Sequence, residues 1–116
     1  MTNYFTDIEI YLRDVTYEAL ISWLCNYFEV KESFPHLVLT REDKDIECLI
    51  VPNAAKGGYT SIWFKSSETP WTTDLDCAKE AYKHLKKEVR CNALPNSDHS
   101  FEWLQVDQNG ETPVSW

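Results

Sequence analysis

The side chains that could carry out covalent or acid–base chemistry are two cysteines and three histidines: Cys77, Cys91, His36, His84 and His99. Cys77 is predicted to lie in the first turn of a helix, where the positive end of the helix dipole lowers the pKa of a thiol. Asp74 and Asp76 beside it oppose thiolate formation, and His84 lies about 10 Å further along the helix, too far to act as its base. The pattern favours an inert, partly buried thiol over a small cysteine-dependent enzyme that uses Cys77.

Metal and cofactor motifs have the wrong spacing. A zinc set would have to combine residues 7, 7 and 8 positions apart, unlike the short ligand pairs of structural zinc sites: Cys77, His84, Cys91 and His99. The acidic segment 42–47 lacks the glycine and the final glutamate of a calcium loop, and Lys56-Gly57-Gly58 lacks the pattern of a phosphate-binding loop. We therefore expect no metal, no cofactor and no catalytic residue.

The elements that would position these groups are best defined around Cys77. Thr73 can accept a hydrogen bond from the amide of Asp76 and so begin a helix, while Pro70 fixes the approach of the chain. Residues at steps of three and four then form one apolar stripe: Leu75, Ala78, Tyr82, Leu85 and Val89. Trp71, just before the cap, is expected to close over the first turn. The segment 88–91 fits either the end of this helix or a short strand.

Strand patterns and one further helix account for the rest of the chain. Strands are predicted over 6–13, 36–40, 46–51, 59–65, 101–107 and 112–116, and a helix over 16–28. The polar segment 41–45 and the pair Asn109-Gly110 predict hairpin turns, and Pro113 places the last strand at a sheet edge. The order β-α-β-β-β-α-β-β predicts an α+β fold in one domain, residues 1–116. We expect an antiparallel sheet of about five to six strands, with both helices packed on one face.

Charge and composition exclude several classes of partner. The formal net charge of −8 argues against a nucleic-acid-binding surface, and the basic residues on the second helix are interpreted as a solvated face. No apolar run approaches a membrane span and the N-terminus has no signal pattern, so we expect a cytoplasmic protein without a membrane partner. The four cysteines form no C-x-x-C pair and are interpreted as mostly buried free thiols: Cys25, Cys48, Cys77 and Cys91.

The aromatic content is high, with five Trp, six Tyr and five Phe. Tyr and Trp dominate the energetically important positions of protein interfaces. Six of them are the candidate partner-binding residues: Tyr11, Tyr59, Trp63, Trp71, Trp103 and Trp116. If both helices cover one side of the sheet, Tyr11, Tyr59 and Trp63 line the other side. They then form either an exposed patch beside acidic residues or a second core, over which Trp103 and Trp116 fold.

One stretch also carries a family resemblance. It begins with Trp63-Phe64-x-Ser66 and continues with Thr69-Pro70-Trp71-x-x-Asp74-x-x-Cys77-Ala78-x-x-Ala81. Together with Val89-Arg90-Cys91 and the terminal Trp116, this pattern resembles a family of small bacterial proteins without an assigned function. The resemblance covers the C-terminal half of the chain. It implies a bacterial or phage origin and a compact α+β fold, but it implies no reaction and no functional residues.

These observations lead to a non-enzymatic, acidic, protein-binding module as the main functional hypothesis. A more specific form is an inhibitor or immunity-type protein that presents carboxylates to a basic partner such as a nuclease. Self-association into a homodimeric structural domain, through the same aromatic patch or the strand that contains Pro113, is the first alternative. The cysteine-dependent enzyme based on Cys77 is the second.

Overall fold

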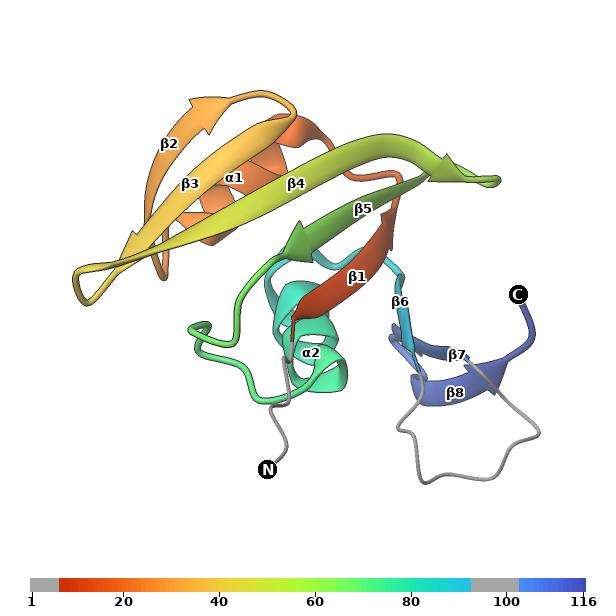
Figure 1. The fold of residues 1–116 in the computed structure, drawn as a ribbon. Helices are drawn as coiled ribbons and strands as arrows, with labels where there is room; N and C mark the ends of the chain where they lie inside the picture. Colours follow the sequence, from red (N-terminus) through yellow and green to blue (C-terminus); the bar gives the residue numbers. More distant parts are fainter. Residues whose placement is uncertain (1–6, 93–102) are drawn as a thin grey trace.

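The computed structural model describes residues 7–92 and 103–116. Within them the chain forms ten elements: β1 (Ile8–Arg13), α1 (Tyr17–Leu24), β2 (Glu29–Ser33), β3 (His36–Arg41), β4 (Lys44–Ala55), β5 (Tyr59–Phe64), α2 (Asp74–Leu85), β6 (Val89–Asn92), β7 (Trp103–Asp107) and β8 (Gly110–Val114). The strands form one sheet in the order β2-β3-β4-β5-β1-β6-β7-β8. Every neighbouring pair is antiparallel. Figure 1 shows a strongly curved sheet, with α1 behind β3 and β4 and α2 below β1.

The predicted antiparallel sheet and pair of helices are confirmed, but the predicted number of strands is wrong. The sheet has eight strands, not five to six, because two extra strands, β2 and β6, are present. β2 contains a single apolar residue, Val30, which is the composition of an edge strand that packs little of its surface. β6 has only four residues, too few to show a clear alternation. The predicted helix over 16–28 is also shorter, because α1 ends at Leu24.

The helices pack against one face of the sheet and enclose a single core. The register brings Ile10 opposite Ile62, Ile62 opposite Ile50, and Leu12 opposite Val89, so buried residues lie side by side across the central strands. Leu20, Trp23 and Leu24 of α1 join the same core, as do Cys77, Ala78 and Ala81 of α2. Because side chains alternate along a strand, the residues between these buried ones point to the opposite face.

The two ends of α2 follow different local rules. The hydroxyl of Thr73 accepts a hydrogen bond from the Asp76 amide at 3.1 Å, which confirms the predicted cap. The helix ends at Leu85, followed by Lys86 in the left-handed region with φ 59°, and the Lys86 amide donates to the Tyr82 carbonyl. Val89 therefore belongs to β6 and not to the helical stripe. The stripe is centred on Cys77, Ala78 and Ala81, with Leu75, Tyr82 and Leu85 half-buried beside it.

Both predicted hairpins are present, and the last strand lies where Pro113 requires. Glu42 and Asp43, both at positive φ, form the turn between β3 and β4. Gly110 at φ 94° follows the turn between β7 and β8, where the Asp107 carboxylate accepts a hydrogen bond from the Asn109 amide. β8, which contains Pro113, is one edge of the sheet and β2 is the other.

Candidate protein-binding surface

The face of the sheet that points away from α1 and α2 is called the open face here. Within residues 7–92 and 103–116, no helix covers it. Its aromatic cluster consists of Tyr11, Tyr59, Trp103 and Trp116. Its apolar strip consists of Val38, Leu49, Val51 and Trp63, which the strand register places on the same side. Two of the central strands, β5 and β1, supply members of the cluster, and β4 and β5 supply most of the strip.

The aromatic cluster is built around Trp116, which lies just after β8. Its ring centroid lies 5.2 Å from that of Tyr11, 4.8 Å from that of Tyr59 and 4.9 Å from that of Trp103. Tyr11 and Trp103 also meet edge to face at 5.6 Å. Tyr59 is buried beneath these contacts, whereas Trp116 keeps 42% of its surface exposed. The C-terminal hairpin thus folds over Tyr11 and Tyr59, as the second-core alternative expects, and its outermost indole still faces solvent.

Two arginines and one glutamate hold the phenol of Tyr59. Its hydroxyl donates to the Glu88 carboxylate, which also accepts from Nε of Arg90 at 3.2 Å. The Arg90 guanidinium lies 5.2 Å from the Tyr59 ring centroid and 4.9 Å from that of Trp116, within cation–π range. Arg13 lies 5.9 Å from the Tyr59 ring. Burial, followed by the hydrogen bond to Glu88, raises the pKa of Tyr59 to about 12, so the phenol stays a neutral donor near pH 7.

The apolar strip is more exposed than the cluster. Leu49 pairs with Trp63 across β4 and β5, and Val51 pairs with Ser61 one step further along. Val38 on β3 and Val51 on β4 keep 36% and 39% of their surfaces exposed. The Trp63 indole donates to the Asp7 carboxylate at 2.7 Å, and the Lys65 ammonium lies 4.7 Å from the Trp63 ring centroid. The strip is therefore an apolar ridge bordered by charged groups.

Charged residues of both signs lie on the open face. Carboxylates come from Asp7 and Glu9 beside Trp63 and Tyr11, and from Glu47 opposite Val38. Cations come from Lys65, Arg13 and Arg90. The predicted acidic groups therefore lie beside the aromatic side chains. The structure adds a cationic centre around Tyr59, where Glu88 pairs with both arginines.

Five of the six candidate partner-binding residues lie on the open face: Tyr11, Tyr59, Trp63, Trp103 and Trp116. The sixth, Trp71, does not. It is buried on the helix side, stacked on Trp23 with ring centroids 5.5 Å apart and packed against Phe64 at 5.3 Å. Contacts with Trp23 of α1 and Phe64 of β5 hold this indole on the helix side of the sheet, so Trp71 supports the fold and is not part of the open face.

Three residues of the open face were not predicted from the sequence: Val38, Val51 and Arg90. Val38 and Val51 could have been found, because each alternates with buried neighbours, Leu37 and Leu39 in one case and Ile50 in the other. In the sequence, Arg90 continues the helical spacing of the lysines of α2, which favours a solvated cation on the helix. Its location in β6, opposite Tyr11 in the register, brings it instead to the aromatic cluster.

Among the described side chains considered for catalysis, Cys77 and Cys91 are both buried in the core, whereas His36 and His84 are exposed at the surface. Cys77 is fully buried, and burial raises its pKa well above the ordinary value, with the Asp74 charge acting in the same direction. His84 is exposed, and its Nε2 lies 3.7 Å from a Glu80 carboxylate oxygen. His36 is exposed on β3, and His99 lies outside the described residues. All four cysteines are free, and only Cys25 is exposed. These environments give the cysteine-dependent enzyme no support.

In the described part of the chain, no cluster of three or more ligand-type side chains could hold a metal ion. None of the helices described has the length and apolar character needed to cross a membrane. No family model, curated protein or solved structure matches the chain. The resemblance of residues 63–91 to small bacterial proteins therefore stays a prediction.

Proposed function

We propose that this chain is a non-enzymatic module that binds a partner protein through the open face. The observation that supports this most directly is that α1 and α2 both pack on one side of an eight-stranded sheet. The other side keeps Val38, Val51 and Trp116 exposed. Exposed apolar side chains next to clustered aromatic rings are characteristic of protein interfaces, where a partner removes them from water.

The net charge indicates the chemistry of that partner. A chain with a formal net charge of −8 attracts a basic protein over a distance of about one Debye length, which accelerates encounter. The apolar strip then supplies the contact that excludes water, and the carboxylates of Asp7, Glu9 and Glu47 pair with cations at its border. An inhibitor or immunity-type protein directed at a basic enzyme such as a nuclease fits this combination.

The proposal can be tested by titrating the protein against a panel of basic nuclease domains at about 0.05 M and about 0.5 M salt. We expect one saturable complex that weakens as salt increases. The double variant Val38→Ser with Val51→Ser should weaken it by about 10-fold or more, because it removes the exposed ridge. The matched control is Phe34→Ser, which removes an exposed apolar side chain from the turn between β2 and β3, outside the open face. Equal effects of the double variant and the control would contradict the proposal.

A second copy of the chain is the competing occupant of the same face. Light scattering at several protein concentrations separates the two cases. If the wild-type protein is a dimer and the Val38→Ser/Val51→Ser variant is a monomer, the open face serves self-association and not binding of a different protein. A monomer at every concentration leaves the open face available for a different protein.

A further inference from the structure

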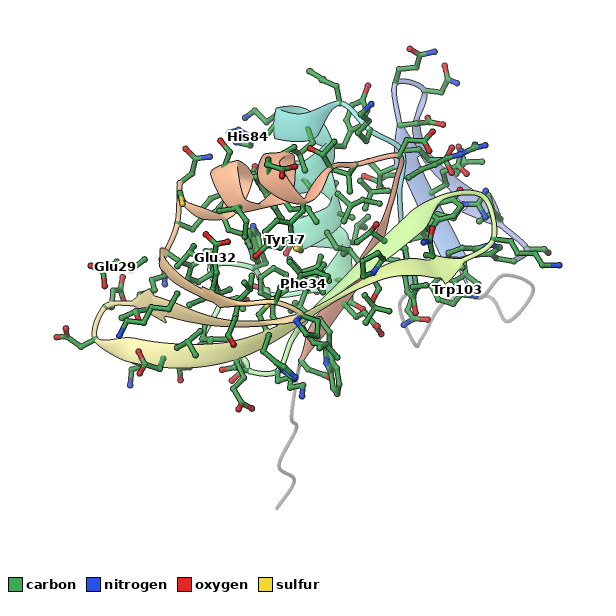
Figure 2. All side chains as sticks on the ribbon, turned by 90° about the horizontal axis from the view of Figure 1, so that it is seen from above. Tyr17, Glu29, Glu32, Phe34, His84 and Trp103 are labelled. Carbon is green, nitrogen blue, oxygen red and sulfur yellow. The ribbon has the colours of Figure 1, made fainter. Side chains whose placement is uncertain are left out.

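The second edge of the sheet has a groove beside it. β2 pairs with β3 on one side, and no other described strand pairs with it on the opposite side. Between β2 and α1 lies a depression of about 350 Å³, lined by Tyr17, Glu18, Ile21, Ser22 and Glu32. Figure 2 shows Tyr17 of α1 and Glu32 of β2 side by side. An unpaired edge next to a helix provides both backbone groups and a floor for an added strand.

The two edges of the sheet differ in how well they could accept such a strand. β8 contains Pro113, which has no amide hydrogen, so that edge cannot offer a complete ladder. β2 contains no proline, and its register with β3 is continuous from Glu29 to Ser33, without a bulge. An edge strand of this kind leaves the amide and carbonyl groups of alternate residues without a ladder partner. β2 is therefore the edge at which strand addition is structurally feasible.

The floor of the groove is apolar and its rim is negative. Tyr17 and Ile21 are half-buried and pack against the core. Phe34, in the turn just after β2, meets the Tyr17 ring edge to face at 5.2 Å and keeps 54% of its surface exposed. Glu18 and Glu32 supply the two carboxylates.

The Glu32 carboxylate is held in position by Tyr17. The Tyr17 hydroxyl donates to a Glu32 oxygen at 2.9 Å, and this bond fixes the carboxylate at the wall of the groove. Glu32 pairs with the buried Leu37, so it points to the helix side. Lys31 pairs with Val38 and points to the open face, so the one cation of β2 does not neutralise the groove.

We infer that β2 and α1 form a docking groove for an extended segment of a partner protein that carries Lys or Arg between apolar residues. The added strand pairs with β2, and every second side chain falls on the helix side. There, a long basic side chain lays its methylene groups over Tyr17 and Ile21 and places its charge between Glu18 and Glu32. This surface differs from the open face, so the inference goes beyond the proposed function.

The probe is an end-blocked peptide of about seven residues in which valine and lysine alternate. A peptide that alternates valine and glutamate tests the charge preference, and a lysine peptide with methylated backbone amides tests strand pairing. Binding is measured by fluorescence anisotropy, and the site is located from amide chemical shifts of the labelled protein. We expect saturable binding of the lysine peptide alone, with shifts concentrated in β2 and α1.

Charge-neutral variants test the groove without changing its shape. The double variant Glu18→Gln with Glu32→Gln should weaken binding of the lysine peptide by about 10-fold. The matched control, Glu42→Gln with Glu68→Gln, changes the net charge equally at exposed sites outside the groove and should change binding less than about 2-fold. Equal losses in both variants would show attraction by net charge alone and overturn the inference.

Other results would overturn it as well. If the glutamate peptide bound as tightly as the lysine peptide, the groove would have no preference for a basic residue. If the methylated peptide bound as tightly, the segment would not pair with β2 as a strand. No saturable binding, or shifts located on the open face, would reject the groove. Concentration-dependent shifts of β2 amides without peptide would make a second copy the occupant. The Val38→Ser/Val51→Ser variant should bind the lysine peptide normally, so failure of the groove and failure of the open face can be distinguished.

Discussion

The two faces of the sheet remove their apolar side chains from water in different ways. On the helix side, aliphatic and aromatic residues such as Ile10, Ile62 and Phe64 are buried completely against α1 and α2. On the open face, Tyr11 and Trp103 are half-buried and Trp116 closes over them, with the Arg90 guanidinium against the Trp116 ring. One face excludes solvent by adding a layer of helices, whereas the other gathers its own aromatic side chains and keeps part of them exposed.

The difference separates stability from recognition. Complete burial yields the larger contribution to folding because the free energy follows the apolar area removed from water. A half-exposed cluster contributes less to folding and retains area that a partner can cover. The following predictions test this contrast.

The largest expected difference concerns thiol reactivity. With native protein, Cys25 should react with a thiol reagent more than about a thousand times faster than the three buried cysteines, which become accessible only through unfolding. Burial also raises the pKa values of Cys48 and Cys91 to about 12, which suppresses their thiolates. Time-resolved mass spectrometry of labelled peptides measures the rates. Fast labelling of Cys77 would contradict the burial and restore the cysteine-dependent enzyme as a hypothesis.

Truncation of a core ring should have the largest effect on stability. Phe64→Ala should lower the free energy of unfolding by about 3–5 kcal/mol, since it opens a cavity between Trp71 and Phe28. Val51→Ala changes a residue of the adjacent strand that lies on the open face. It should lower the free energy of unfolding by less than about 1 kcal/mol because Val51 is already partly solvated. Urea denaturation of both variants gives the comparison. Similar losses would mean that the open face is buried in solution.

Removal of the outermost indole should have an intermediate effect. Trp116→Ala should lower the free energy of unfolding by about 1–2 kcal/mol, because it removes three ring contacts and the cation–π contact with Arg90. The matched control is Phe34→Ala, which removes an exposed ring that packs against Tyr17. A loss no greater than that of the control would indicate that Trp116 does not close over the cluster in solution.

The smallest effect concerns pH. Burial, with smaller contributions from Asp7 and Glu9, raises the pKa of Asp74 to about 6 from its ordinary value of 3.8, although the hydrogen bond from the Glu9 amide acts in the opposite direction. The folded protein therefore holds this proton more tightly than the unfolded chain. Lowering the pH from about 7 to about 5 should stabilise the wild-type fold through this group, and raising it should reverse the gain.

Asp74→Asn removes this component of the pH dependence. Between about pH 7 and about pH 5, the free energy of unfolding should rise more for the wild type than for the variant. The difference should be less than about 1 kcal/mol, since solvent reaches the half-buried carboxyl. Urea midpoints at both pH values provide the measurement. Asp76→Asn, which changes an exposed carboxylate in the same helical turn, is the matched control. Parallel pH profiles for wild type and Asp74→Asn would contradict the assignment.

The parts of the fold with strong local signals could be predicted from the sequence. Thr73 caps α2 as its position indicates, and Asn109-Gly110 forms the last hairpin. The strands that alternate clearly, such as β1 and β5, were found. β2 could not be predicted because an edge strand that contacts little of the core has few apolar residues. Residues 88–91 fit either a helix end or a strand because Val89 continues the helical period of α2.

The open face could be predicted only in part. Alternation on β1 and β5 placed Tyr11, Tyr59 and Trp63 on one side, since period two is a local property. The packing of Trp103 and Trp116 over those rings depends on β6 joining β7 to β1, which no local pattern encodes. The side of the sheet on which Trp71 lies could not be predicted, because an indole before a helix cap can turn either way. Its direction is fixed by Trp23 and Phe64, both distant in sequence.

The central position of β1 has a consequence for how the chain assembles. β2 to β5 pair in the order in which they follow one another along the chain, and so do β6 to β8. Only β1 joins them, and its residue Ile8 finds its partner Phe64 far along the chain. Closing that long loop delays assembly relative to the hairpins. A polypeptide without β1 would lack the strand that pairs with both β5 and β6.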